Sequence, residues 1–248
     1  MKDPYFDVQS EMGITKHAGG WKATKELAEL CHIGNNKYVL VVGCGTGISA
    51  NKLQKEYKCK LLGVDLHPRM IEQSKKEYPD MKFQVADAQK LPFKSNTFDA
   101  IISESVTAFP PGKLKAIKEY RRVLKPKGYV GLNETTWLSK PRKELTDYTV
   151  KAMGGVRPES GRNWENLIRK AGLKVVFAEP RKIKAFEQAV GEMQLNGLKN
   201  IKAFSRLIPY YFTKKEFRQA MNELVKHAVH VPKGFLKCLG YGLYVGQK

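Results

Sequence analysis

The chain has 248 residues, of which 42% are hydrophobic, so it is long enough for one α/β domain with an insertion. No segment approaches the apolar length that crosses a bilayer, and the first residues lack an apolar signal core. The four scattered cysteines lack metal-ligand spacing, so we expect reduced thiols, no metal and a cytoplasmic protein. The net charge of +20 contains no long basic block, which favours solubility and general anion attraction over a dedicated nucleic-acid groove.

The N-terminal region, residues 1–36, contains a candidate lid followed by a helix. His17 lies in the stretch Lys16–Trp21, whose glycines allow close backbone approach and whose histidine and tryptophan offer polar and stacking surface. This stretch is either a lid over a ligand or a linker before the next helix. Trp21–Cys31 has the apolar spacing of an amphipathic helix.

A strand, a glycine loop and a helix follow in Tyr38–Ala50, which reads YVLVVGCGTGISA. Four consecutive apolar residues, three of them valine, suit a strand that is buried on both faces of a parallel sheet. Glycines at 43, 45 and 47 let the backbone turn sharply and let a ligand approach the main chain. With the helix predicted over Ser49–Tyr57, this order predicts a nucleotide-binding βα unit.

An acidic residue ends the next predicted strand, Lys60–Asp65. Asp65 comes 22 residues after Gly43, which is one βαβ step, and a carboxylate at a strand end can accept hydrogen bonds from two ribose hydroxyls. The alternative is a helix-capping role before His67 and Pro68.

The glycine spacing separates two kinds of nucleotide site. Dinucleotide dehydrogenases use G-x-G-x-x-G, whereas here the third glycine comes one residue earlier. At this point the chain resembles the class I S-adenosylmethionine (SAM) dependent methyltransferases of the small-molecule type, whose first motif is G-x-G-x-G. The resemblance is strong over Tyr38–Leu138 and looser over the last strands. It implies a doubly wound α/β fold with a Rossmann-like, seven-stranded, mostly parallel sheet, SAM as the methyl donor and S-adenosylhomocysteine as the product.

Further motifs in the expected order extend the resemblance. The pattern Ala86-Asp87-Ala88 follows the third strand, and Leu91-Pro92-Phe93 comes shortly after it. In the family an acid at the Asp87 position hydrogen-bonds the adenine amino group, although Asp87 alone is also compatible with a simple turn. The family positions near the ribose and adenine match Leu66 to Met70. The resemblance therefore implies these cofactor-binding residues: Gly43, Cys44, Gly45, Gly47, Asp65, Leu66, Met70, Asp87, Ala88 and Glu104.

The remaining core strands are predicted from apolar runs. The fourth is Phe98–Ser103 and the fifth Tyr129–Asn133, after a turn that resembles R-x-L-K-P-G-G but has Lys127 in place of the first glycine. The sixth is Leu173–Phe177. The last strand, Tyr241–Val245, has no helix after it and is predicted to insert antiparallel beside the sixth.

Four regions are expected: the lid and helix (1–36), the core (37–181), a helical cap insertion (182–236) and the final strand (237–248). Within the cap, helices are predicted over Gln188–Leu207 and Thr213–Val229. An aromatic and apolar tract with many basic residues indicates an apolar or amphipathic acceptor and peripheral association with an anionic membrane surface. Alternatively, the aromatics only pack the cap onto the core. Trp137, Tyr210 and Tyr211 are the candidates for contacting the acceptor.

One departure from the family concerns the end of the first strand. The family usually carries an acid two residues before the first glycine, near the SAM amino group, and this chain has Val41 there. Glu104 is the main candidate for a catalytic base, a substrate contact or a replacement for that acid, and His17 is the second catalytic candidate.

Three functions are compatible with these motifs. The leading one is methyl transfer to a small or lipid-like acceptor by in-line displacement. The second is RNA or DNA methylation, which the positive charge favours, but Ser103-Glu104-Ser105-Val106 stands where enzymes that methylate base amino groups typically carry an N/D/S-P-P-Y/F/W tetrad. The third is a non-catalytic SAM-binding protein. The sequence identifies neither the acceptor nor the oligomeric state.

Overall fold

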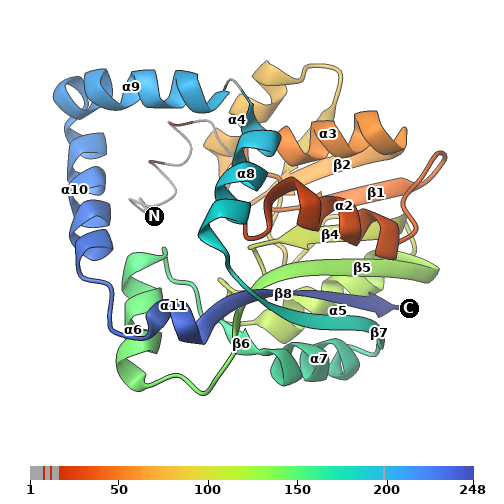
Figure 1. Ribbon diagram of the computed structural model, residues 1–248. Helices are drawn as coiled ribbons and strands as arrows, with labels where there is room; N and C mark the ends of the chain where they lie inside the picture. Colours follow the sequence, from red (N-terminus) through yellow and green to blue (C-terminus); the bar gives the residue numbers. More distant parts are fainter. Residues whose placement is uncertain (1–7, 9–11, 13–16, 198) are drawn as a thin grey trace.

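The computed structural model shows an α/β fold around one sheet, and it describes residues 8, 12, 17–197 and 199–248 (Figure 1). Seven strands lie in the order β3-β2-β1-β4-β5-β8-β7, and the two-residue strand β6 pairs with β5. Strand β8 runs antiparallel to both neighbours, and the other strand pairs are parallel. The bounds of the strands are β1 Tyr38–Val42, β2 Lys60–Asp65, β3 Lys82–Val85, β4 Phe98–Glu104, β5 Leu124–Trp137, β6 Glu159–Ser160, β7 Lys174–Lys182 and β8 Leu239–Gln247.

Helices cover both faces of this sheet. The bounds are α2 Gly20–Leu30, α3 Ile48–Tyr57, α4 Pro68–Glu77, α5 Lys113–Val123, α6 Lys143–Ala152, α7 Gly161–Lys170, α8 Ala185–Asn196, α9 Lys199–Thr213, α10 Lys215–Val229 and α11 Phe235–Cys238. Helices α2 and α3 contribute to the hydrophobic cluster on one face, and α5 and α7 contribute to the cluster on the other. Successive residues of β1 alternate between the two clusters, which confirms that the valine-rich strand is buried on both sides.

The predicted fold class and the place of the last strand are confirmed. Strand β8 lies between β5 and β7, and β7 contains the predicted sixth strand. The short strand β6 and the helix α6 were not predicted. The turn before the predicted fifth strand is part of the long strand β5, and within it Lys127 adopts φ +64°, a value that favours glycine.

The helices of the cap are divided differently from the prediction. The single helix expected over Gln188–Leu207 is two helices, α8 and α9, because Gly197 adopts φ +54° and ψ −133° at the end of α8. The aromatic tract lies inside α9, which contains Pro209. Helix α8 packs on the core, since Leu195 belongs to the cluster under α2 and a side chain on Gly20 would collide with the backbone of Gly191.

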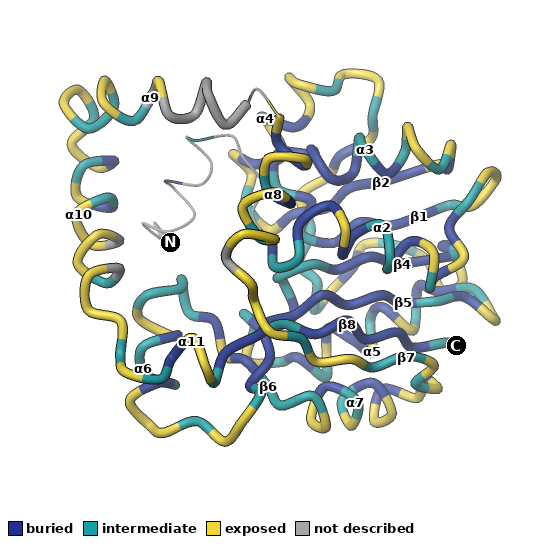
Figure 2. The backbone as a smooth tube through the Cα atoms, viewed as in Figure 1, coloured by how far each residue is buried: buried dark blue, intermediate teal, exposed yellow. Residues whose placement is uncertain are grey.

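Helices α9 and α10 stand away from the sheet, joined at a corner (Figure 1). Buried positions concentrate in the strands of the sheet, whereas α8 and α10 carry many exposed positions (Figure 2). None of the described helices has the length and apolarity that a bilayer-spanning segment requires.

Candidate functional site

The glycine loop between β1 and α3 has three glycines with positive φ, at 43, 45 and 47. A side chain at Gly43 would collide with Val106, and one at Gly47 would meet the ring of Phe83 at 2.8 Å. A side chain at Gly45 would meet nothing within 4 Å. The outer two glycines therefore allow close packing, and only the middle one faces free space where a ligand can approach the backbone.

Asp65 ends β2 next to this loop and holds it in place. One carboxylate oxygen accepts a hydrogen bond from the backbone N–H of Gly45 at 2.9 Å, and the other accepts one from the N–H of His67, also at 2.9 Å. Burial raises the pKa of Asp65, while these two hydrogen bonds act in the opposite direction. Each oxygen keeps a lone pair, so the carboxylate can still accept hydrogen bonds from a ligand.

The other positions matched to the cofactor divide into two groups. Leu66 is next to Asp65 in the chain and is 59% exposed. Asp87 and the half-buried Ala88 follow β3 at the same carboxyl edge of the sheet. The side chain of Asp87 accepts a hydrogen bond from the N–H of Gln89 at 2.8 Å. The side chains of Cys44 and Met70 are buried, and Cys44 packs in the core cluster with α2 and α3. Cys44 can therefore contribute to a ligand site mainly through its backbone.

Glu104 lies at the carboxyl end of β4 in a polar cluster. The hydroxyl of Thr24 donates to both carboxylate oxygens at 3.0 and 3.1 Å, and Asn133 Nδ2 donates to Oε1 at 3.3 Å. His17 Nε2 lies 2.9 Å from Thr24 Oγ1 and 3.5 Å from Glu104 Oε1. The structure thus joins the two catalytic candidates, and the glutamate side chain is only 7% exposed.

The turn from His17 to Gly20 is fastened to α8 as well as to the sheet. Gln188 donates to the carbonyl of His17 at 3.0 Å and accepts from the N–H of Gly19 at 2.9 Å. Asn133 Nδ2 donates to the carbonyl of Ala18 at 2.8 Å. This turn therefore lies against the carboxyl ends of β4 and β5. Of the residues before His17, the structure describes Val8 and Met12.

Glu134 is a buried carboxylate that the sequence did not single out. Its oxygens accept hydrogen bonds from the backbone N–H groups of Val106, Thr107 and Ala108 at 3.2, 2.7 and 3.2 Å. Burial raises the pKa of Glu134 to about 7, although these three donors favour the charged form. Because Val106 rests against Gly43, Glu134 fixes the loop after β4 against the glycine loop.

Several buried polar atoms near these loops have no hydrogen-bond partner in the described part of the chain. Two are the hydroxyls of Thr46 and Ser49, in the glycine loop and the first turn of α3. Two others are Asn133 Oδ1 and the hydroxyl of Thr135, near the carboxyl end of β5. Leaving such groups unpaired is costly, so their clustering at the carboxyl edge of the sheet suits a polar ligand.

The three residues assigned to the acceptor have protein partners. Trp137 is buried, with its ring centre 6.5 Å from that of Phe235, in a small cluster with α6 and α11. Tyr210 packs on Phe217 between α9 and α10, and the hydroxyl of Tyr211 donates to Asn222 at 2.9 Å. Tyr210 and Tyr211 thus pack between the cap helices α9 and α10, whereas the alternative for the cap aromatics expected them to pack the cap onto the core.

Residues missed by sequence reasoning complete the site: Thr24, Asn133, Glu134 and Gln188. Asn133 could have been found, because it ends a predicted strand that neighbours the strand of Glu104. Gln188 carries no local signal, since it acts on residues about 170 positions earlier in the chain.

Comparison with known proteins places these features in a family. Residues 39–128 match the sequence profile described as a methyltransferase domain. An uncharacterised protein of Haemophilus influenzae is 30% identical over 177 residues, which are 67% of this chain and 70% of that protein. The uncharacterised methyltransferase YodH of Bacillus subtilis is 25% identical over 242 residues, which are 92% of this chain and 97% of that protein.

Solved structures show the same fold at low sequence identity. The cyclase SpnF aligns with a TM-score of 0.78 and 16% identity, covering 99% of this chain and 93% of that one. Phosphoethanolamine N-methyltransferase 2 of Haemonchus contortus, solved with SAM, aligns with a TM-score of 0.75 and 16% identity, covering all of this chain and 57% of that one. Together with the glycine loop, the acid after β2 and the antiparallel last strand, these similarities show that the chain belongs to the class I SAM-dependent methyltransferases.

Proposed function

We propose that this protein binds SAM at the carboxyl edge of β1, β2 and β4 and transfers its methyl group to a small or lipid-like acceptor. SAM supplies a methyl group on a positively charged sulfur, which is already a strong electrophile. The chain therefore has to hold the donor, position the acceptor and exclude water, and a general base is required only for an acceptor that is protonated at neutral pH.

The observation that carries this proposal is the fixed pair of Asp65 and the glycine loop. The carboxylate is 2.9 Å from the backbone nitrogen of Gly45, which is the one glycine of this loop that faces free space. Its remaining lone pairs can receive the ribose hydroxyls, and the unpaired hydroxyls of Thr46 and Ser49 offer further polar contacts. The residues present therefore fit the cofactor.

We propose that Glu104 takes the place of the acid that the family usually carries at the position of Val41. Strands β1 and β4 pair with Val41 beside Ile102, so Glu104 lies on the same face of the sheet, two residues further along the adjacent strand. Continuing this backbone register by one residue past Val42 and Ser103 sets Glu104 opposite Gly43, which supports the proposed role. Thr24, Asn133 and His17 fix the side chain from the other side, so that it can receive the amino group of SAM without reorganisation.

The acceptor is proposed to enter from the side of β5 and the cap. Each of the four regions of the chain has its own proposed role in binding the donor and the acceptor. Residues 1–36 supply the lid and α2, 37–181 bind the donor, 182–236 form the cap, and 237–248 add the final strand. A small acceptor is supported by the phosphoethanolamine N-methyltransferase among the structural neighbours. We propose cytoplasmic action, which the four unpaired cysteines suit.

Isothermal titration calorimetry with SAM, S-adenosylhomocysteine and NADH tests the donor site, and absence of SAM binding would refute it. Methyl-labelled SAM is then incubated with metabolite, lipid, RNA and DNA fractions, and labelled products are identified by mass spectrometry. Label in small molecules or lipids is expected; label confined to nucleic acid, or no label in any fraction, would contradict the proposed reaction.

The role of Glu104 is tested by Glu104→Gln, with Glu56→Gln on the exposed side of α3 as the control. Loss of one charge-assisted contact should weaken SAM binding about tenfold or more. If SAM affinity is unchanged and only turnover falls, Glu104 acts on the acceptor and not on the donor.

A further inference from the structure

Exposed apolar side chains are concentrated in one segment of the sequence. Of the 14 large hydrophobic residues that are exposed in the described chain, ten lie between residues 183 and 236. This segment is less than a quarter of the sequence, so the concentration is not a general property of the surface.

In helix α9, the exposed apolar side chains are different from those that pack against the rest of the cap. Leu207 and Tyr210 pack inward with Phe217, Ala220 and Val8. Ile208 and Phe212, spaced by four residues, point elsewhere and are 71% and 73% exposed. Residues at this spacing lie on one side of a helix, so α9 has a second apolar side that the cap leaves uncovered.

The charge around this apolar side is positive. Between residues 193 and 215 the sequence has five lysine or arginine residues and no aspartate or glutamate. Lys214 and Lys215 follow α9 directly at the corner with α10, and the ammonium of Lys214 lies 3.8 Å from the centre of the Tyr210 ring. Over residues 183–236, nine basic residues stand against four acidic ones.

We propose that α9 and the turn that follows it dock the protein on an anionic lipid bilayer, with Ile208 and Phe212 entering the interface and Lys214 and Lys215 facing the lipid headgroups. Helices of this kind lie in the plane of the membrane and do not cross it. Each lysine near an anionic surface strengthens binding by roughly fivefold, which corresponds to about 1 kcal/mol. Docking at this corner does not depend on the identity of the methyl acceptor.

Charge complementarity selects this partner over two others. A second copy of the chain would bring the same basic segment against itself, in a protein with a net charge of +20. A nucleic acid would match the charge and could stack a base on Phe212, but it offers no apolar environment for Ile208, which is equally exposed. Only a lipid surface combines negative charge with an apolar interior.

Co-sedimentation with vesicles tests the proposal. One set contains phosphatidylcholine alone, and the other contains about one third phosphatidylglycerol. The full-length protein is expected to sediment with the anionic vesicles, to bind neutral ones at least tenfold more weakly, and to be released partly by salt. Equal partitioning to both sets, or no partitioning to either, would overturn the proposal.

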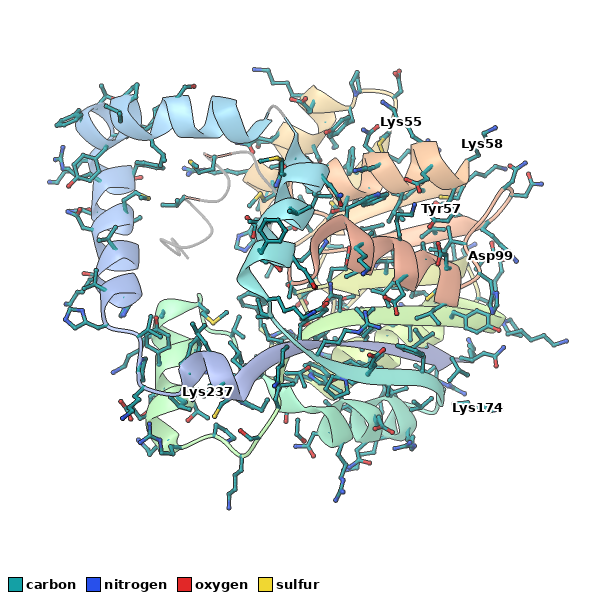
Figure 3. The ribbon with its side chains drawn as sticks, viewed as in Figure 1. Lys55, Tyr57, Lys58, Asp99, Lys174 and Lys237 are labelled. Carbon is teal, nitrogen blue, oxygen red and sulfur yellow. The ribbon has the colours of Figure 1, made fainter. Side chains whose placement is uncertain are left out.

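Two pairs of variants separate this corner from general surface effects. Ile208→Ser with Phe212→Ser should weaken binding at least tenfold, whereas Val85→Ser with Val176→Ser, exposed on β3 and β7, should not. Lys214→Glu with Lys215→Glu should also weaken it at least tenfold, whereas Lys55→Glu with Lys58→Glu, at α3 and its C-terminal end, should have a much smaller effect (Figure 3).

Further outcomes would count against the lipid partner. Equal losses in the test and control pairs would show that the corner has no special role. A dimer that the Ile208→Ser with Phe212→Ser variant dissociates, or RNA binding that competes fully with the vesicles, would assign the surface to another partner. Circular dichroism and SAM titration of each variant confirm that the fold and donor site are intact.

Discussion

Replacing Glu134 by glutamine should remove a pH dependence from the stability of this protein. The carboxyl is fully buried, and its pKa is raised by burial from 4.5 to about 7. The native carboxyl therefore keeps its proton up to about pH 7, whereas the unfolded one loses it near 4.5. The native state binds more protons between these values, so stability falls as the pH rises through this window.

The size of the effect follows from the pKa difference. A difference of about 2.5 corresponds to about 3 kcal/mol, of which about 2.5 kcal/mol is lost between pH 5 and pH 8. Glutamine has the same shape, and its carbonyl can accept from Val106 and Thr107. Its amide group cannot accept from Ala108, which adds a cost that does not depend on pH.

The measurement is the free energy of unfolding from urea titrations of both proteins at pH 5 and pH 8. Other titrating groups are common to the two proteins, so they cancel in the difference. Between pH 5 and pH 8, the free energy of unfolding of Glu134→Gln should fall by about 2.5 kcal/mol less than that of the wild type. If the two proteins differ by the same amount at both pH values, the raised pKa and the reasoning from burial are wrong.

Four further predictions concern the site and the fold. Asp65→Ala should weaken SAM binding in calorimetry by one or two charge-assisted hydrogen bonds, each about 1.5–3 kcal/mol, and normal affinity would exclude Asp65 from the site. Gly47→Ala should destabilise the protein in thermal melts more than Gly45→Ala, because only the former collides with a ring, and the reverse order would contradict the packing described. Lys127→Gly should stabilise the protein by about 1 kcal/mol in urea titrations, since Lys127 has φ +64°; a loss of stability would show that its side chain matters more than its backbone. Tyr210→Ala should cost roughly 2–4 kcal/mol if the packing on Phe217 is its main role, and a stable variant with lost turnover would restore its place in the pocket.

Local sequence determined the frame of the donor site. The valine run of β1, the glycines after it and Asp65 at the end of β2 lie within 30 residues, and each has a short-range physical meaning. Alternating strands and helices dictated a parallel sheet with its ligand at the carboxyl edge. The last strand, with no helix after it, was correctly predicted to run antiparallel beside the sixth, because no crossover helix was available to it.

Tertiary structure alone decided which polar residues from distant parts of the chain contact the loops around the donor site. Gln188 fastens the turn after His17, and Glu134 fastens the loop at Val106, through pairings between residues far apart in the chain. The sequence placed Glu104 at the right edge, but only the packing of α2 supplied Thr24 as its partner. Patterns of apolar residues fix which face of an element is buried, whereas polar contacts depend on which elements meet. That information is absent from local spacing, because it arises only when the helices close over the sheet.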